Sequence, residues 1–457
     1  MSLGQLFDVF IQKSPVTVLM RATIEAIFSP KNLDAIFQQH AVKQYAGPLL
    51  FSTVFQLLCT VVWKQRRSVR DAYNKELEVD YQYSIRSIYN KLNGTETQVC
   101  RGLVKETAGQ LTEVVQQFQR KQNPLLRGFQ IRILDGNHLP ATDHRLKVLR
   151  KTASGPLPGQ AIAVLDPDRK LIVDLFPCED GEAQERRILP AVIATVVAGE
   201  LWLGDRNFCT TKFLFGVADN GGHFLVRQHK STLTWNEETK LKKVGRCDSG
   251  TLYEQTLSLL NDDKVLRVRR IVVKLDKPTR DGETEIALLT NLPVSLASAK
   301  KVAALYWERW TIENAFQEIE QSLRSEINTL GYPGAALLGL AIAMVTYNAL
   351  SVTKWAIASE HSETIERSQI SSYYMTSTIA SDYAGMMLVL PPAEWTKRFG
   401  ALSPRELARE LKRIARHVRI EVYRKTTRAE KKPKPKRTSG KWNHHVSTAQ
   451  LLAQAKG

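Results

Sequence analysis

The sequence has few cysteines, and they follow no metal-binding or disulfide pattern. Its 457 residues include five cysteines, far apart and without a Cys-x-x-Cys pair. This argues against a zinc finger and against a disulfide framework, and it favours a reducing compartment. A glycine-rich P-loop is also missing, so no nucleotide cofactor is expected. The first residues, MSLGQLFDVFIQKSP, lack a basic segment followed by an apolar one, so no signal peptide is expected.

Acidic residues are scarce relative to basic ones. The chain has 64 Lys and Arg against 46 Asp and Glu, a net charge of +18. This excess indicates a polyanionic partner, either nucleic acid or, less often, an anionic membrane surface. Residues 405–441 hold fifteen basic and four acidic residues, so the rest of the chain carries only +7. A basic tail can be no more than a non-specific contact. Whether the rest of the chain binds a polyanion therefore needs separate evidence.

One long stretch, residues 327–353, contains no charge and is strongly apolar. About 20 apolar residues are needed to cross a bilayer, so its length is borderline. A Tyr-Pro-Gly break at 332–334 interrupts its start. We therefore expect a helix buried inside a large domain rather than a membrane span, and no membrane partner.

The pattern of apolar and polar residues along the sequence predicts a helical region, an α/β core and a β insertion. Residues 1–122 show helical periodicity and are expected to bind DNA ends. Within them, DYQYSIRSIYNKLNG is either the second half of a helix-turn-helix or a solvated basic helix. Residues 123–230 and 297–375 alternate between strand and helix patterns, which predicts a central sheet. Short β-type runs predict an inserted β subdomain over residues 231–296.

The remaining residues divide into two parts. Helical patterns continue over residues 376–424. Residues 425–457 are basic and rich in Lys and Pro, which predicts disorder in the free protein.

Three carboxylates stand where a metal site could form. Asp135 and Asp205 follow the apolar runs IRIL and LWLG, so we expect both at the carboxyl ends of strands, where sites form in α/β sheets. Glu313 lies in YWERWTIENAFQEIEQSLR, where Tyr306, Arg309, Gln317, Glu320 and Arg324 would share its helical face. Alone, each Asp could be a turn residue and the helix an ion-paired surface. Together they suggest oxygen ligands for Mg²⁺ or Mn²⁺ and phosphoryl transfer.

These blocks resemble a known family. Tyr306-x2-Arg309-x3-Glu313 resembles the Y-R-E-K signature of the DDE transposases of bacterial insertion sequences, the IS-four group. IRILDGNHL and LGDRNFC match the blocks of the first and second Asp, and a β-rich insertion falls within the 107 residues between Asp205 and Glu313. One position departs from the signature, because Glu320 replaces its Lys.

The resemblance implies a ribonuclease H-like catalytic core, interrupted by the β-rich insertion and flanked by helical N- and C-terminal regions. By resemblance, Asp135, Asp205 and Glu313 are the catalytic carboxylates and hold Mg²⁺, which Mn²⁺ could replace. It also implies residues that bind DNA: Tyr306, Arg309, Trp310, Arg206, Asn207 and Arg324. Arg324 is included because of the departure at Glu320 and not by the signature itself. Either Arg324 grips the terminal phosphate in place of the missing Lys and Glu320 orients it by an ion pair, which we favour, or the contact is absent and the DNA end is held more weakly.

The activity implied is metal-dependent cleavage at transposon ends and strand transfer into target DNA, by cut-and-paste with a hairpin intermediate. Its partners would be DNA with terminal inverted repeats, target DNA and a second copy in a synaptic homodimer, in the bacterial cytosol at the nucleoid. Two alternatives stay open: a structure-selective nuclease on the same fold, and a non-catalytic repressor. The presence of all three carboxylates favours catalysis.

Overall fold

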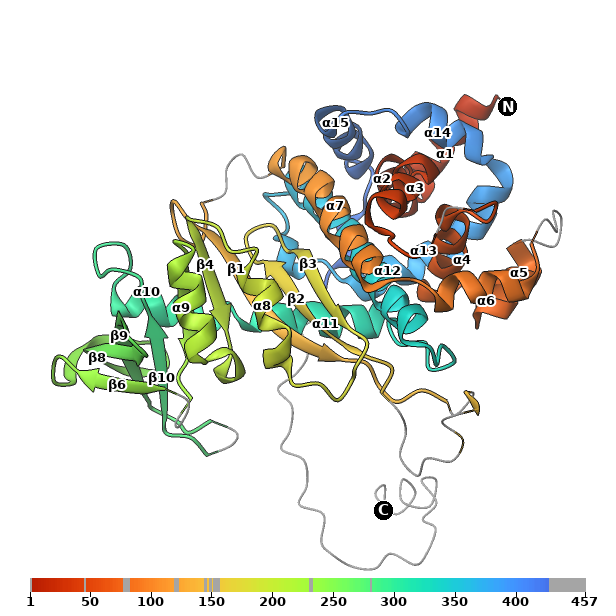
Figure 1. Cartoon of the computed structure of the whole chain (residues 1–457). Helices are drawn as coiled ribbons and strands as arrows, with labels where there is room; N and C mark the ends of the chain where they lie inside the picture. The colour runs from red at the N-terminus through yellow and green to blue at the C-terminus, as the bar shows by residue number, and fades with distance from the viewer. Residues whose placement is uncertain are drawn as a thin grey trace, which may run out of the picture. The chain divides into compact units, whose positions relative to one another are not determined.

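The computed structural model describes residues 2–44, 47–76, 83–118, 123–143, 146–147, 150, 157–229, 233–279 and 282–426. The predicted disordered segment, residues 425–457, lies almost entirely outside them. Residues 1–424 form one compact unit. Figure 1 shows its helices and its sheet.

Five strands form the part of the sheet that carries the blocks of Asp135 and Asp205. β1 runs antiparallel to β2, and β2 to β3, whereas β1, β4 and β5 are parallel neighbours. The strand order β3-β2-β1-β4-β5 with these directions is that of the ribonuclease H-like fold, so the predicted α/β fold class is confirmed. The bounds are β1 Gln130–His138, β2 Gln160–Asp166, β3 Leu171–Cys178, β4 Glu200–Gly204 and β5 His223–Arg227.

The insertion does not form a separate sheet but extends this one. β10 pairs antiparallel with β5, and the order continues through β9, β8 and β6, with β7 also paired to β8. Without β10, β5 would be an edge strand with unpaired backbone groups. The insertion is therefore fixed to the core by backbone hydrogen bonds. Figure 1 shows its strands β6, β8, β9 and β10. Its strands are β6 Thr234–Glu237, β7 Lys242–Cys247, β8 Gly250–Asn261, β9 Lys264–Leu275 and β10 Glu285–Thr290.

Helices cover both faces of the sheet. α8 and α9 pack on one face, in a core with Leu134, Trp202 and Phe224. α7, α11 and α12 belong to the core of the other face, which includes Ile133 and Leu203. Because side chains alternate along a strand, successive residues of β1 and β4 face different helical layers. The bounds are α7 Thr97–Gln116, α8 Leu189–Ile193, α9 Thr211–Asp219, α11 Trp310–Ser322 and α12 Pro333–Glu360.

The long apolar helix α12 lies in the interior. Every residue from Gly334 to Ile357 is buried, which confirms the expected buried helix. It is the one helix among the described residues that is long and apolar enough to cross a membrane, and its apolar window is wholly buried. Asn348 pairs with the backbone of Ile172 in β3 at both its N–H and C=O, at 2.8 Å each, so a polar group ties the helix to the sheet.

Further helices flank the sheet-bearing region on both sides in sequence (Figure 1). Before it come α1 Leu3–Lys13, α2 Pro15–Ile27, α3 Pro30–His40, α4 Phe51–Val62, α5 Val69–Glu76 and α6 Ile85–Asn93. After it come α13 Ser372–Val389, α14 Pro392–Phe399, α15 Pro404–Ala415 and α16 Ile420–Tyr423. α2, α12 and α15 contact one another, so both ends of the chain share a core.

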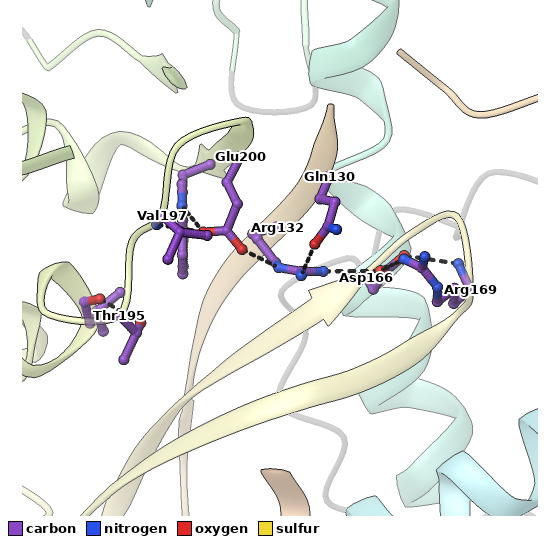
Figure 2. Close-up of polar contacts among 9 residues, drawn as sticks. Gln130, Arg132, Asp166, Arg169, Thr195, Val197 and Glu200 are labelled. Carbon is purple, nitrogen blue, oxygen red and sulfur yellow. Dashed lines mark hydrogen bonds and ion pairs between the residues drawn. The ribbon is translucent and has the colours of Figure 1, made fainter. Parts of the chain in front are cut away.

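A buried ion network fixes the central strands. Figure 2 shows Arg132 of β1 between Asp166 of β2 and Glu200 of β4. Its guanidinium donates to Asp166 Oδ2 at 3.0 Å and to Glu200 Oε1 at 2.9 Å, and both carboxylates are almost fully buried. The Arg169 guanidinium also donates to Asp166 Oδ2. The remaining oxygens, Asp166 Oδ1 and Glu200 Oε2, accept from the Arg169 backbone N–H and the Trp202 indole N–H. The network therefore cross-links three adjacent strands and supports their register.

Candidate functional site

The register of β1 against β4 brings two of the carboxylates together. Gln130 pairs with Glu200, and the pairing continues to Ile133 and Leu203. Two residues further along, the same register places Asp135 level with Asp205, on strands that lie roughly 5 Å apart. By alternation, both side chains face the layer of α11 and α12.

Asp205 directly follows β4, as predicted, but Asp135 lies inside β1. The expectation that the first strand ends at Asp135 is wrong, because β2 continues to pair with β1 as far as His138. The site nevertheless forms at a strand end, since β4 stops at Gly204 and leaves room beside Asp135. Asp205 Oδ1 accepts the backbone N–H of Asn207 at 2.8 Å, which fixes this carboxylate at the start of a short turn.

Glu313 approaches from the helical layer. It lies in the first turn of α11, which contacts β1 and buries Ile312, Ala315 and Ile319 in the core. The pKa of Asp135 is raised to about 7, mainly by burial; Arg309 opposes this rise, and the charges of Asp205 and Glu313 add to it. The three predicted carboxylates therefore share one electrostatic neighbourhood.

The single helix expected over residues 306–324 is two helices. α10 Ala299–Trp307 ends just before α11, and residues between them make i→i−3 hydrogen bonds, such as Arg309 N–H to Tyr306 C=O at 3.0 Å. Tyr306 therefore lies in α10 and Glu313 in α11. The side chains still meet, because Arg309 pairs with Glu313 at 2.7 Å and hydrogen-bonds Tyr306.

Arg309 is the central cation of the site. Its side chain is about nine-tenths buried, and its guanidinium lies 4.8 Å from the ring centroid of Trp310, which is itself half exposed. Its Nε is buried and has no hydrogen-bond partner among the described residues. Burial raises the pKa of the neighbouring Tyr306 phenol to about 12, so that group stays protonated.

Arg206 and Asn207, the two residues after Asp205 that were predicted to bind DNA, have different partners. Arg206 is exposed and pairs with Glu283 of the insertion at 3.8 Å. The side chain of Asn207 hydrogen-bonds Glu185, a residue that the sequence patterns did not single out. Glu185 stands in a polar segment after β3 without any motif, so only the folded chain brings it to the site.

Arg324 lies away from these residues. The expectation that it extends the helical face of Glu313 is wrong, because α11 ends at Ser322 and Leu323 is extended. The guanidinium of Arg324 instead donates to the carbonyls of Arg66 at 3.2 Å and Arg67 at 2.6 Å. These acceptors lie just after α4, so this side chain joins α11 to the N-terminal helices.

The donor set fits a divalent cation in its chemistry. All the carboxylates around Asp135 offer oxygen, which Mg²⁺ and Mn²⁺ prefer, and a cation would relieve the repulsion that raises the pKa of Asp135. Within the described ranges, however, no three His, Cys, Asp or Glu side chains are close enough to hold one ion in common. Glu313 is engaged by Arg309. The described residues therefore contain no preformed cage for such an ion.

Comparisons with known proteins agree with this geometry. Residues 127–348 match the family model of the transposase DDE domain. The candidate transposase y4zB of Sinorhizobium fredii (strain NBRC 101917 / NGR234) is 28% identical over 195 residues, which cover 41% of this chain. The chain spans about half of that relative, 51% of its length.

A solved structure, the piggyBac transposase synaptic complex with hairpin DNA, has a TM-score of 0.39 and 10% identity, covering 87% of this chain and 85% of that one. The match of the family model includes the segments of all three carboxylates, from β1 through the start of α11 and into α12. Residues 127–348 are therefore similar to the transposase DDE domain.

Proposed function

We propose that the protein is a DNA transposase that cuts DNA at the ends of a mobile element and joins those ends to target DNA. The observation that carries the proposal is the placement of Asp135 level with Asp205 on neighbouring strands of a ribonuclease H-like sheet, with Glu313 near enough to raise the pKa of Asp135, within a segment that matches the DDE domain. The net charge of +18 suits a polyanionic substrate.

The metal in this proposal is Mg²⁺, with Mn²⁺ as a substitute, held by Asp135, Asp205 and Glu313. A pair of bound divalent ions would activate the attacking oxygen and stabilise the leaving oxygen of a phosphodiester. The protein's own contribution is to place these carboxylates on rigid strands and a packed helix. To join them at the metal, Glu313 has to leave Arg309, which is then free for another anion.

A DNA phosphate is the anion that we propose for Arg309. The guanidinium offers a buried Nε without a partner, and phosphate binds guanidinium well through paired hydrogen bonds. Tyr306, hydrogen-bonded to Arg309, would hold the same phosphate, and the half-exposed ring of Trp310 would contact the DNA end. Asn207 and Arg206, both exposed beside Asp205, complete the proposed DNA-binding set.

The rest of the proposed cycle follows the family resemblance. It consists of cleavage at terminal inverted repeats, a hairpin intermediate, and strand transfer by a synaptic homodimer in the bacterial cytosol.

The test uses the full-length protein, Mg²⁺ and DNA that carries the inverted repeats flanking its gene. Cleavage and joined products are resolved on a denaturing gel. We expect D135N, D205N and E313Q each to lose cleavage while binding the DNA ends, and the exposed control E182Q to cut normally. Near-normal cutting by any of the three variants would contradict the assignment.

The same assay separates two other functions. Cleavage without joined products would indicate a nuclease, and binding without cleavage by the wild-type protein would indicate a repressor.

A further inference from the structure

The helix that carries Glu313, α11, also carries a buried ion pair on another of its sides. Glu318 lies five residues after Glu313, which is about 7.5 Å along the helix and roughly 140° around it. Glu313 lies near Asp135 of β1, whereas Glu318 faces the helical layer. There Glu318 Oε1 accepts from Lys354 Nζ of α12 at 2.7 Å and from the hydroxyl of Ser372, the first residue of α13. This one carboxylate therefore joins three helices.

The charges of this pair are held largely away from water. Lys354 is the only charged residue between Gly334 and Ile357, the buried stretch of α12, and its side chain is 3% exposed. The Glu318 side chain is 22% exposed. Burial acts to raise the pKa of Glu318, but Lys354, the Ser372 hydroxyl and the charge of Arg367 together hold that pKa below its usual value. The carboxylate is therefore ionised at neutral pH.

Stability alone is a poor explanation for such a pair. The cost of taking two charges out of water is comparable to their attraction, and apolar residues of similar volume often stabilise a protein equally well or better. An ion pair does provide direction, because it forms at one relative position of two helices. The hydrophobic effect is not directional, and α12 is apolar on almost all its sides. The pair therefore specifies the rotation and the height of α11 against α12.

Glu313 needs a helix that is held in this way. A shift of one residue is about 1.5 Å along a helix and 100° around it, enough to carry a side chain of α11 away from β1. Arg309 holds Glu313 at 2.7 Å, but Glu313 has to leave that contact to reach the metal. Arg309 then no longer fixes α11. Glu318 still does, because its partners lie in α12 and α13.

We propose that Glu318 and Lys354 are positioning residues, whose buried ion pair holds α11 at the rotation that presents Glu313 to the metal. Ser372 adds a second donor, which orients the Glu318 carboxylate. This inference rests on the proposed function and deepens the same site. It assigns to Glu318 and Lys354 no contact with the metal or with DNA.

The test replaces the pair with apolar residues of similar size, in E318M/K354M. We expect urea unfolding at the wild-type midpoint or above it. Hydrogen exchange of the metal-free, DNA-free protein, measured by mass spectrometry, should be faster in the α11 amides. Cleavage of end DNA should need about 10–100-fold more Mg²⁺, the range for groups that support metal ligands, at unchanged affinity for end DNA.

The matched control is R101M/D174M. It removes an ion pair of 2.8 Å between α7 and β3, which leaves the contacts of α11 intact. Its hydrogen exchange in α11 and its Mg²⁺ requirement should equal those of wild type.

The single variant E318Q separates positioning from stability. It leaves Lys354 buried without a carboxylate, so it should be less stable than E318M/K354M. Its amide oxygen can still accept from Lys354 and Ser372, so it should need less Mg²⁺ than the double variant. A purely structural role predicts the opposite, namely that the less stable variant also needs more Mg²⁺. That result would overturn the inference.

Two other results would also overturn it. One is wild-type hydrogen exchange of α11 in E318M/K354M. The other is a wild-type Mg²⁺ requirement in that variant or, should it not fold, in folded E318Q, while D135N loses cleavage. Normal cleavage by D135N would instead overturn the proposed function.

Discussion

Asp135 makes the metal-free protein sensitive to pH. Its pKa in the folded protein is about 7, against an ordinary 3.8. Between these values the folded protein holds a proton that the unfolded chain has released, so the free energy of unfolding falls as pH rises. The decrease in the free energy of unfolding is complete above pH 7, and it is absent below about pH 4.

D135N should remove this dependence. In the presence of a chelator at pH 8, we expect the free energy of unfolding of D135N to be higher than that of wild type by a few kcal/mol. This follows from about 1.4 kcal/mol for each unit by which the pKa of Asp135 is raised. The advantage should shrink as pH falls through the window and vanish near pH 4. Urea unfolding at several pH values measures it, with the exposed Asp8→Asn as control. A pH-independent difference between D135N and wild type would contradict the raised pKa.

Arg324 has a structural role in the described protein, which changes what its removal should do. Its guanidinium donates to two carbonyls after α4. R324A should therefore lower the free energy of unfolding by roughly 1.5–3 kcal/mol, the range for hydrogen bonds to charged groups. The cleavage rate per folded molecule should be unchanged.

Urea unfolding and end cleavage by the same R324A preparation check both expectations.

Glu320, which replaces the Lys of the family signature, is exposed. E320K should therefore leave the stability that Arg324 provides intact. A loss of cleavage in fully folded R324A would instead restore the hypothesis that Arg324 grips the terminal phosphate.

At the scale of elements, the position of the site depends on how β1 is held between β2 and β4. Arg132 spans both neighbours, and the carboxylates it joins, Asp166 and Glu200, are almost fully buried (Figure 2). The same pairing of β1 with β4 brings Asp135 level with Asp205 three residues further on. A substitution of Arg132 should therefore disturb the positions of Asp135 and Asp205, although Arg132 lies outside the site.

R132A should lower the free energy of unfolding by about 3–5 kcal/mol, because it leaves two buried carboxylates without their shared partner. R132M, which keeps most of the packing, should lose a similar amount, since the missing charge and not the missing volume is the cause. Urea unfolding measures both. The variant R267A, whose guanidinium is largely exposed, is the control and should change stability little. Equal losses at both positions would contradict this reading of the network.

The sequence predicted the strands and helices of the site better than the turns between them and the contacts that fix those turns. Local apolar runs were enough to find β1, β4 and α11, because periodicity is a local property. The break between Tyr306 and Arg309 was missed, since a single tightened turn leaves that periodicity intact. Glu185 was missed because its place depends on contacts between two short turns, Glu185–Arg187 and Arg206–Phe208, and on the absence of a side chain at Gly136.

At the scale of the whole molecule, positive charge is concentrated toward one end. Residues 425–457 contain nine Lys or Arg and one Glu. Since the remainder of the chain holds the carboxylates of the proposed site, the two parts should contribute differently to DNA binding. The site should give dependence on the DNA end, and the basic segment should give affinity for any DNA.

Deleting residues 425–457 should therefore lower affinity for random DNA and flatten the plot of log affinity against log salt concentration. The slope should fall by about 0.9 for each phosphate that the segment neutralises, because a neutralised phosphate releases its counterions. Fluorescence anisotropy at several salt concentrations measures the slope. A variant with Gln in place of the five basic residues within 431–437 keeps the length and should behave like the deletion if charge is the cause. Cleavage by bound protein should persist in both. An unchanged slope would mean that this segment does not neutralise DNA phosphates, and the affinity would then have to come from residues 1–424.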